Sequence, residues 1–264
     1  MANVTLPVSV VVPTHNSEGT VARALQSVLS QTQLPREIVV VDDCSSDSTI
    51  DVINQFLPHN QVDIRIVQLD TNVGPSATRN AGWNSCTSEF VAFLDSDDSW
   101  HPRKLEIQTR WMIENPHRVI SGHLTSSASE QGVWSEIKIR KFGLKHFLAS
   151  NRVSTPTVIV RRNIPDRFSE DMWHAEDYDL WLRVIAMHGE FVRIELPLTQ
   201  LHKADFGESG LSSHLYPMFR GEIFAVQRLR QSGELSLVVA RLTQVWMGLK
   251  YVLRVARTWI RRKR

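Results

Sequence analysis

Four short apolar runs, each followed by a segment of helical periodicity, constrain the fold of this chain more than any other feature. The runs are Val8–Val12, Ile38–Val41, Ile64–Val67 and Phe90–Leu94. Strands that alternate with helices indicate parallel strands joined by βαβ crossovers, and continuous Val/Ile strands suit a sheet covered on both faces. The first ~100 residues therefore predict half of a doubly wound, nucleotide-binding α/β domain.

The sequence contains none of the common glycine-rich phosphate-binding loops. The turn after the first run, from Pro13 to Gly19, lacks the dinucleotide fingerprint, and the chain has no glycine-rich loop ending in Lys-Ser or Lys-Thr. Instead, Asp95-Ser96-Asp97-Asp98 follows the fourth run, where open α/β sheets bind ligands. Its carboxylates repel one another unless a cation or donor groups are present, and Mg²⁺ is typically held by one or two carboxylates plus substrate phosphates. The alternative is an acidic turn, with Asp98 or Ser99 capping the next helix.

Five blocks of the sequence together resemble the inverting family 2 glycosyltransferases of GT-A fold. They fall in the family's order and cover roughly residues 7–205. The blocks are Val8 to Asn16, Val41 to Ser46, Asn72 to Asn80, Asp95 to Asp98 and Glu176 to Arg183.

The resemblance implies a donor site at the ends of the first strands. Asp43 would accept a hydrogen bond from the base or ribose of a UDP-sugar, and Arg79 would lie over the base or near the phosphates. Asp97 would bind a divalent metal, Mn²⁺ or Mg²⁺. The implied nucleotide-binding residues are Pro13, Thr14, Asp43, Arg79, Asp95 and Ser96. The alternatives are that Asp42 and Asp43 cap a helix near Ser46, and that Arg79 lies on a solvated helix face.

The fifth block supplies the candidate catalytic acids. Leu180, Trp181 and Val184 recur at helical spacing, so Glu176 and Asp177 are predicted on the first turn of a helix. By resemblance, Asp177 is the general base that takes the proton of the acceptor hydroxyl, with Glu176 as orienting group or alternative base. The structural alternative is that acids at a helix N-terminus only complement the macrodipole.

The segments around this block are less specific. Residues 191–194 and 198–202 are predicted as two short strands and 155–160 as another. His202, before a Gly- and Ser-containing loop, is a candidate metal ligand or phosphate donor, and the loop at 203–210 is a candidate lid. Trp134, Trp173 and His174 are candidates to face the acceptor.

The low cysteine content and the lack of targeting segments predict a cytoplasmic location. Cys44 and Cys86 are too few for a disulfide framework and fit a reducing cytoplasm. The N-terminus has no pattern of a signal peptide, and no uninterrupted apolar stretch of ~18 residues predicts a transmembrane helix.

The C-terminal segment carries a charge asymmetry. Residues 235–264 contain eight basic and no acidic residues, whereas the remainder has 22 basic against 28 acidic residues. The helical spacing of the cations predicts one basic face, and a basic amphipathic helix with Trp and Tyr is typical of a membrane interface. The alternative is a helix that packs on the enzyme's own core or on a partner. Nucleic acid is not expected as a partner, because the rest of the chain is acidic.

These observations predict an α/β protein with a GT-A, Rossmann-like, mostly parallel twisted sheet, flanking helices and a C-terminal amphipathic extension. Residues 1–100 would form the donor-binding half, 101–210 the acceptor-binding half, and 211–264 a basic helical region. The predicted function is metal-assisted transfer from a UDP-sugar to a lipid-linked or surface-polysaccharide acceptor, at the inner face of the cell membrane. The alternative is a non-catalytic scaffold that binds nucleotide-sugars.

Overall fold

A computed structural model describes residues 5–57, 61–127, 136–202 and 214–262. The chain divides into two compact units. The sheet unit comprises Met1–Lys141, Val153–Pro165 and Phe191–His202, and the helical unit comprises Phe142–Arg152, Asp166–Glu190 and Lys203–Arg264. Over the described ranges, no helix is long and apolar enough to cross a membrane.

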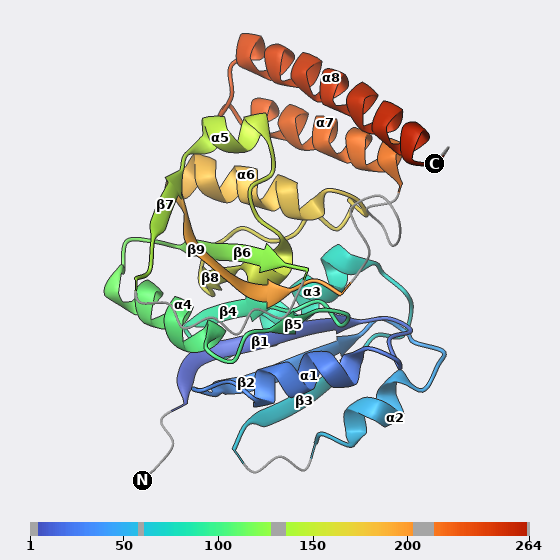
Figure 1. The fold of residues 1–264 in the computed structure, drawn as a ribbon, viewed down its shortest axis with the longest axis vertical. Helices are drawn as coiled ribbons and strands as arrows, with labels where there is room; N and C mark the ends of the chain where they lie inside the picture. The colour runs from blue at the N-terminus through green and yellow to red at the C-terminus, as the bar shows by residue number, and fades with distance from the viewer. Residues whose placement is uncertain (1–4, 58–60, 128–135, 203–213, 263–264) are drawn as a thin grey trace. The chain divides into compact units, whose positions relative to one another are not determined.

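The sheet unit contains one nine-stranded sheet of order β3-β2-β1-β4-β8-β6-β9-β5, with β7 paired to β9 (Figure 1). Its first half is parallel, as predicted, because each strand is followed by a crossover helix. The four strands coincide with the four apolar runs: β1 Leu6–Thr14, β2 Pro35–Asp42, β3 Asp63–Gln68 and β4 Phe90–Phe93.

The second half of the sheet is mixed. It consists of β5 Ser99–Trp100, β6 Ile120–Ser126, β7 Ile139–Phe142, β8 Ile159–Arg161 and β9 Phe191–Gln200. Two strand predictions are wrong here. The two short strands predicted at 191–194 and 198–202 are one strand, Phe191–Gln200, with irregular register on β6. The segment 155–160 begins as the short 3₁₀ helix Thr155–Thr157 before entering β8. Pro156 in that turn cannot donate to a ladder, which accounts for the later strand start.

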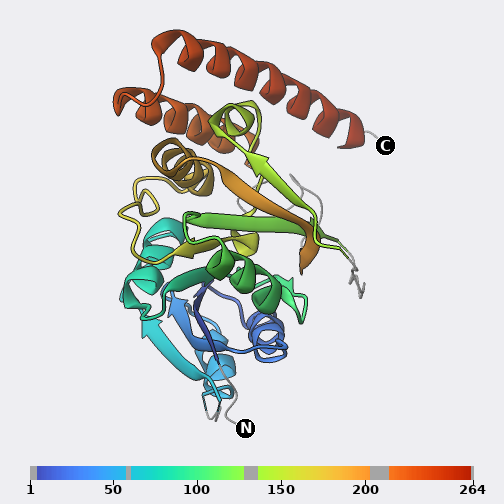
Figure 2. The same cartoon turned by 90° about the vertical axis from the view of Figure 1, so that its left-hand side faces the viewer.

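Helices cover both faces of the parallel half (Figure 2). One face packs against α1 Val21–Leu29, α2 Thr49–Asn54 and α4 Lys104–Glu114 through one apolar cluster. The opposite face carries α3 Pro75–Ser85. At Gly82 of α3, a Cβ atom would lie 2.4 Å from the Val11 side chain, so the close approach of this helix to the sheet requires glycine.

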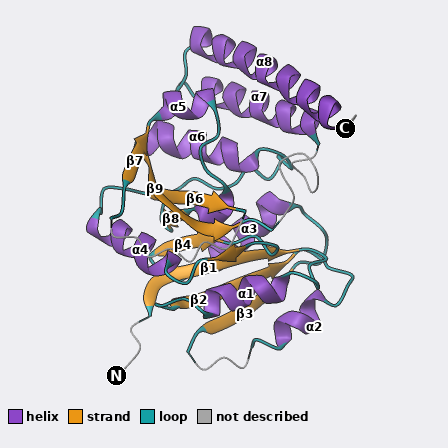
Figure 3. Cartoon of the chain, viewed as in Figure 1, coloured by secondary structure: helices purple, strands orange, loops and turns teal. Residues whose placement is uncertain are grey.

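The helical unit contains the remaining helices, shown in purple in Figure 3. They are α5 Leu144–Ala149, α6 Glu176–His188, α7 Leu215–Gln231 and α8 Leu237–Arg262. Within this unit α6 packs on α7, and α8 runs along α7 while also contacting α5. The predicted C-terminal helix is therefore present, and α7 and α5 support it.

Candidate active site

Asp43 lies where β2 ends and organises the loop before α3. Its carboxylate accepts hydrogen bonds from the backbone N–H groups of Val73 and Gly74 at 2.8 and 2.9 Å. Its own N–H donates to the carbonyl of Thr14, the last residue of β1, at 2.8 Å. Asp43 therefore joins the ends of β1 and β2 to the Asn72–Gly74 segment, at the edge of the sheet where a nucleotide is expected.

The alternative that Asp42 and Asp43 cap a helix is wrong. The next helix, α2, begins at Thr49 with Ser48 at its N-cap position. The Asp42 carboxylate instead accepts the N–H of Ser45 at 3.0 Å and faces the Thr14 hydroxyl at 3.2 Å. Neither aspartate caps α2. Asp42 holds the loop at Ser45, whereas Asp43 holds the N–H of Gly74, the N-cap residue of α3.

Arg79 is buried, so the alternative of a solvated helix face is also wrong. Only 7% of Arg79 is exposed, and its Nη2 lies 2.8 Å from Oδ1 of Asp95. Arg79 sits on α3, and Asp95 follows β4. Packing of α3 on the sheet therefore brings the arginine to the first acid of the Asp95–Asp98 block, and the ion pair satisfies both charges.

The rest of this acidic block is held by neighbours on several elements. The Ser96 hydroxyl lies 2.9 Å from the Ser17 hydroxyl. Arg23 of α1 donates to the backbone carbonyl of Asp97 at 2.7 Å. The block does not cap α4 as the alternative had it, because Ser99–Trp100 forms β5 and α4 starts at Lys104.

His202 joins the same edge from the far end of the sheet unit. Its Nε2 lies 2.7 Å from the Ser99 hydroxyl, and its backbone N–H points to the Asp98 carboxylate at 3.4 Å. Burial and the Arg23 guanidinium lower the pKa of the His202 imidazole, against the opposite influence of the Asp97 carboxylate. A neutral imidazole is the form that binds metals and accepts hydrogen bonds.

The donors at this edge fit a hard divalent cation held partly by a ligand's phosphates. In the parts of the chain that the structure describes, no group of three or more His, Cys, Asp and Glu residues is placed to hold a metal alone. Asp95 is paired with Arg79 and Asp98 faces the His202 N–H. Asp97 lies close enough to His202 to influence its imidazole, and its carboxylate fits a site completed by phosphate oxygens, the arrangement typical of Mg²⁺.

Two further residues at this edge were not singled out from the sequence. The Nδ1 atom of His15 lies 2.8 Å from the backbone carbonyl of Asp43, and the Asn72 side chain lies 3.2 Å from Nε2 of the same ring. Both fall inside the blocks that carry the family resemblance, which is the signal that points to them.

In the helical unit, Glu176 and Asp177 open α6 as predicted, after Ala175 in the left-handed conformation. Glu176 is buried. The Asp177 carboxylate accepts the N–H of Tyr178 at 2.6 Å and an amide hydrogen of Asn151 at 3.3 Å. The reversal at Ala175 and the two donors give this carboxylate a defined orientation, as a general base requires.

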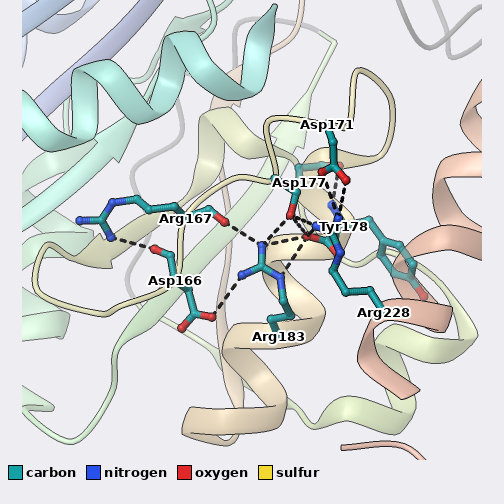
Figure 4. Close-up of polar contacts among 9 residues, drawn as sticks. Asp166, Arg167, Asp171, Asp177, Tyr178, Arg183 and Arg228 are labelled. Atoms are coloured by element: carbon teal, nitrogen blue, oxygen red, sulfur yellow. Dashed lines mark hydrogen bonds and ion pairs between the residues drawn. The ribbon is translucent and has the colours of Figure 1, made fainter. Parts of the chain in front are cut away.

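The later charged residues of α6 form a structural network (Figure 4). Asp179 is fully buried, and its Oδ2 accepts from the Ser169 hydroxyl and from Arg183, one turn later. Arg183 also donates to the backbone carbonyl of Arg167 at 2.7 Å. Arg228 of α7 pairs with Asp171 at 2.7 Å. Asp179 therefore has a structural role in holding the 166–171 segment, whereas Asp177 remains the candidate base.

Helix α7 approaches the segment before these acids at Gly221. A Cβ atom there would lie 2.3 Å from the backbone carbonyl oxygen of His174. The His174 ring lies beside His214, the residue before α7, with ring centroids 5.7 Å apart. Trp173 is 48% exposed. The candidate lid at 203–210 and Trp134 lie outside the described residues.

The predicted single basic face of α8 is wrong for the cations that the structure describes. Lys250 donates to the Ala149 carbonyl and Arg254 pairs with Glu222, so both point toward the unit's own helices, whereas Arg241 is exposed. The outward side of α8, here called the outer face, is apolar instead. It comprises Val238, Leu242, Val245, Leu249, Val252 and Leu253, each more than half exposed.

Comparison with known proteins gives a consistent result. The sequence model described as Glycosyl transferase family 2 matches residues 9–165. The chain is 31% identical over 178 residues to the UDP-Glc:alpha-D-GlcNAc-diphosphoundecaprenol beta-1,3-glucosyltransferase WfgD of Escherichia coli, which covers 67% of this chain and 69% of that protein. It is 38% identical over 109 residues to the putative teichuronic acid biosynthesis glycosyltransferase TuaG of Bacillus subtilis, covering 40% of this chain and 42% of that protein.

Solved structures share the fold. A crystal structure of S. aureus TarS in complex with UDP-GlcNAc superposes with a TM-score of 0.69 at 23% identity, over 90% of this chain and 70% of that one. The mannosyltransferase PcManGT from Pyrobaculum calidifontis, in complex with GDP-Man and Mn²⁺, gives a TM-score of 0.64 at 14% identity, over 97% of this chain and 76% of that one.

Proposed function

Because this chain belongs to glycosyltransferase family 2, and so is an enzyme of glycosyl transfer, we propose that it moves a sugar from a UDP-sugar to a hydroxyl of a lipid-linked or surface-polysaccharide acceptor, with inversion. The observation that carries the donor proposal is the polar edge of the sheet unit, where Asp43 holds the N-terminal end of α3 and Arg79 of the same helix pairs with Asp95. The relative WfgD, named for UDP-glucose and a GlcNAc-diphosphoundecaprenol acceptor, supports this substrate class.

Each residue at this edge has a separate role in binding the donor or the metal. Pro13 and Thr14 line the base and ribose pocket beside Asp43, which accepts a hydrogen bond from the base or ribose. Ser96 lies next to Asp95 at the ribose. Arg79 lies over the base or near the phosphates of the donor, and its ion pair with Asp95 fixes the guanidinium there in a buried position. Asp97, with His202 as a second candidate, holds Mn²⁺ or Mg²⁺, which when bound neutralises the departing diphosphate.

Asp177 accepts the proton of the attacking acceptor hydroxyl. A single displacement with inversion needs one base and no second nucleophilic carboxylate, and base help of this kind contributes typically ~10²–10⁴-fold. Glu176, adjacent and buried, orients the base or replaces it.

The same proposal places the enzyme at an anionic membrane surface on the cytoplasmic side. Support comes from the outer face of α8, from the exposed cations Arg241 and Arg257, and from the lack of acidic residues in 235–264. An exposed apolar face beside cations suits the interface of an anionic bilayer. In sedimentation with vesicles of anionic lipid, truncation after Gly233 should release the protein, whereas dimerisation of the intact chain without lipid binding would assign α8 to a second copy.

The reaction is tested with UDP-glucose and a synthetic GlcNAc-diphospho-lipid dispersed in detergent. Asp177→Asn should abolish transfer and leave UDP affinity nearly intact, since the base acts on the acceptor. UDP should bind weakly in EDTA and more tightly after Mn²⁺ is added. Transfer that survives in Asp177→Asn but not in Glu176→Gln would reverse the two roles. If the protein binds UDP but transfers sugar from no UDP-sugar, the alternative of a non-catalytic scaffold that binds nucleotide-sugars would be favoured.

A further inference from the structure

The inward side of α8 holds the end of a helix near the candidate base. Trp246 Nε1 and Lys250 Nζ both donate to the backbone carbonyl of Ala149, at 2.8 and 3.0 Å. Ala149 is the last residue of α5. The last carbonyls of a helix have no partner within the helix, and a cation there is favoured by the helix dipole. Two side chains of α8 therefore satisfy one otherwise orphaned acceptor.

From that carbonyl the chain reaches the base within two residues. Asn151 donates an amide hydrogen to Oδ2 of Asp177 at 3.3 Å. A second link runs from the first turn of α6 back to α5, because the Tyr178 hydroxyl donates to the Phe147 carbonyl at 3.0 Å. The segment from Phe147 to Asn151 is thus connected to α8 on one side and to the residues of the base on the other.

We propose that the inward side of α8 positions the general base: Trp246 and Lys250 fix the end of α5, and Asn151 orients the Asp177 carboxylate from there. This inference rests on the proposed role of Asp177. It gives α8 two separable tasks, since the outer face is the proposed lipid-contacting surface and the inward side supports the base. Loss of the inward contacts should therefore lower transfer even when the acceptor is dispersed in detergent and no membrane is present.

The test uses full-length Trp246→Phe/Lys250→Met, which removes both donors and keeps apolar bulk. Gly248→Ala is the matched control, because its Cβ would meet no atom within 4 Å. Hydrogen–deuterium exchange of peptides covering 145–152 and 176–180 reports the positioning without any reaction. We expect faster exchange in both peptides of the double variant and wild-type exchange in the control.

With UDP-glucose and the GlcNAc-diphospho-lipid in detergent, the double variant and Asn151→Ala should lose about tenfold in kcat, a part of what a base contributes. The KM for UDP-glucose should stay within about twofold, because the donor residues belong to the sheet unit. Lys250→Arg, which keeps a donor, should retain most activity.

Unchanged exchange in both peptides of the double variant would overturn the proposal, as would wild-type kcat in that variant. If the wild-type enzyme does not turn over this substrate pair, the proposed substrates are wrong, and the exchange of the two peptides still decides whether α8 orders the segment around Asp177.

Discussion

Gly221→Ala should impair catalysis through a single added methyl group. The new Cβ would lie 2.3 Å from the His174 carbonyl oxygen, and Cβ atoms essentially never lie closer than 3.0 Å to such an atom. Helix α7 and the His174–Ala175 backbone must therefore separate by about 0.7 Å. That backbone leads directly into Glu176 and Asp177. Since a misplacement of about 1 Å in catalytic geometry can cost ~10²-fold, we expect kcat to fall ~10- to 100-fold.

The stability change has two opposing parts. Alanine in a helix interior is favoured over glycine by about 1 kcal/mol, whereas overpacking costs ~1–3 kcal/mol. The net effect of Gly221→Ala should therefore be neutral to destabilising. In Gly248→Ala of α8 the new Cβ meets no atom within 4 Å. Only the gain in helix propensity applies there, so this variant should be more stable with unchanged kcat.

The assay is release of UDP from UDP-glucose with the GlcNAc-diphospho-lipid acceptor, together with thermal unfolding and calorimetric titration of UDP. UDP affinity should be the same in both variants, because the donor residues lie in the sheet unit. Equal kcat and equal unfolding midpoints for Gly221→Ala and Gly248→Ala would refute the reasoning, since the steric contact would then have no consequence.

Three other predictions concern the sheet unit. Burial, together with the nearby Lys104 charge, lowers the pKa of His123 to about 3. The folded state therefore loses stability as the pH falls from ~6.5 toward 3, by up to ~1.4 kcal/mol per pH unit, because only the unfolded state takes up this proton. Chemical unfolding of His123→Phe should show a shallower dependence of the unfolding free energy on pH than the wild type, and equal pH dependence would contradict this. Burial lowers the pKa of Lys104, whose Nζ lies 3.7 Å from the Trp100 ring centroid; Lys104→Met should raise the unfolding midpoint by about 2 °C or more at pH 7. This advantage should shrink as pH approaches ~10, where the unfolded lysine also loses its proton. Arg79→Met leaves the Asp95 charge without its buried partner, so calorimetry should show UDP affinity lower by about tenfold or more, and wild-type affinity would remove Arg79 from the donor site.

The sequence by itself determined the elements whose signal is local. Runs such as Val8–Val12 and Phe90–Leu94 became β1 and β4 because continuous β-branched and aromatic residues suit a strand covered on both faces. Glu176 and Asp177 came to the first turn of α6 because Leu180, Trp181 and Val184 set its buried side. The order of the polar blocks placed Asp43 and Asp95 at strand ends, which is a consequence of βαβ topology.

Tertiary structure alone decided which polar groups meet. Arg79 pairs with Asp95, and His202 reaches Ser99 across 103 positions of sequence, because α3 and β9 pack beside the ends of β4 and β5. The faces of α8 were also undetermined from spacing. Periodicity shows that two sides differ but not which one is buried, and here Lys250 and Arg254 turn inward because the Ala149 carbonyl and Glu222 compensate their charges. The apolar residues opposite them are exposed in the part of the chain that the structure describes, and an exposed apolar patch of this kind is typical of an interaction surface.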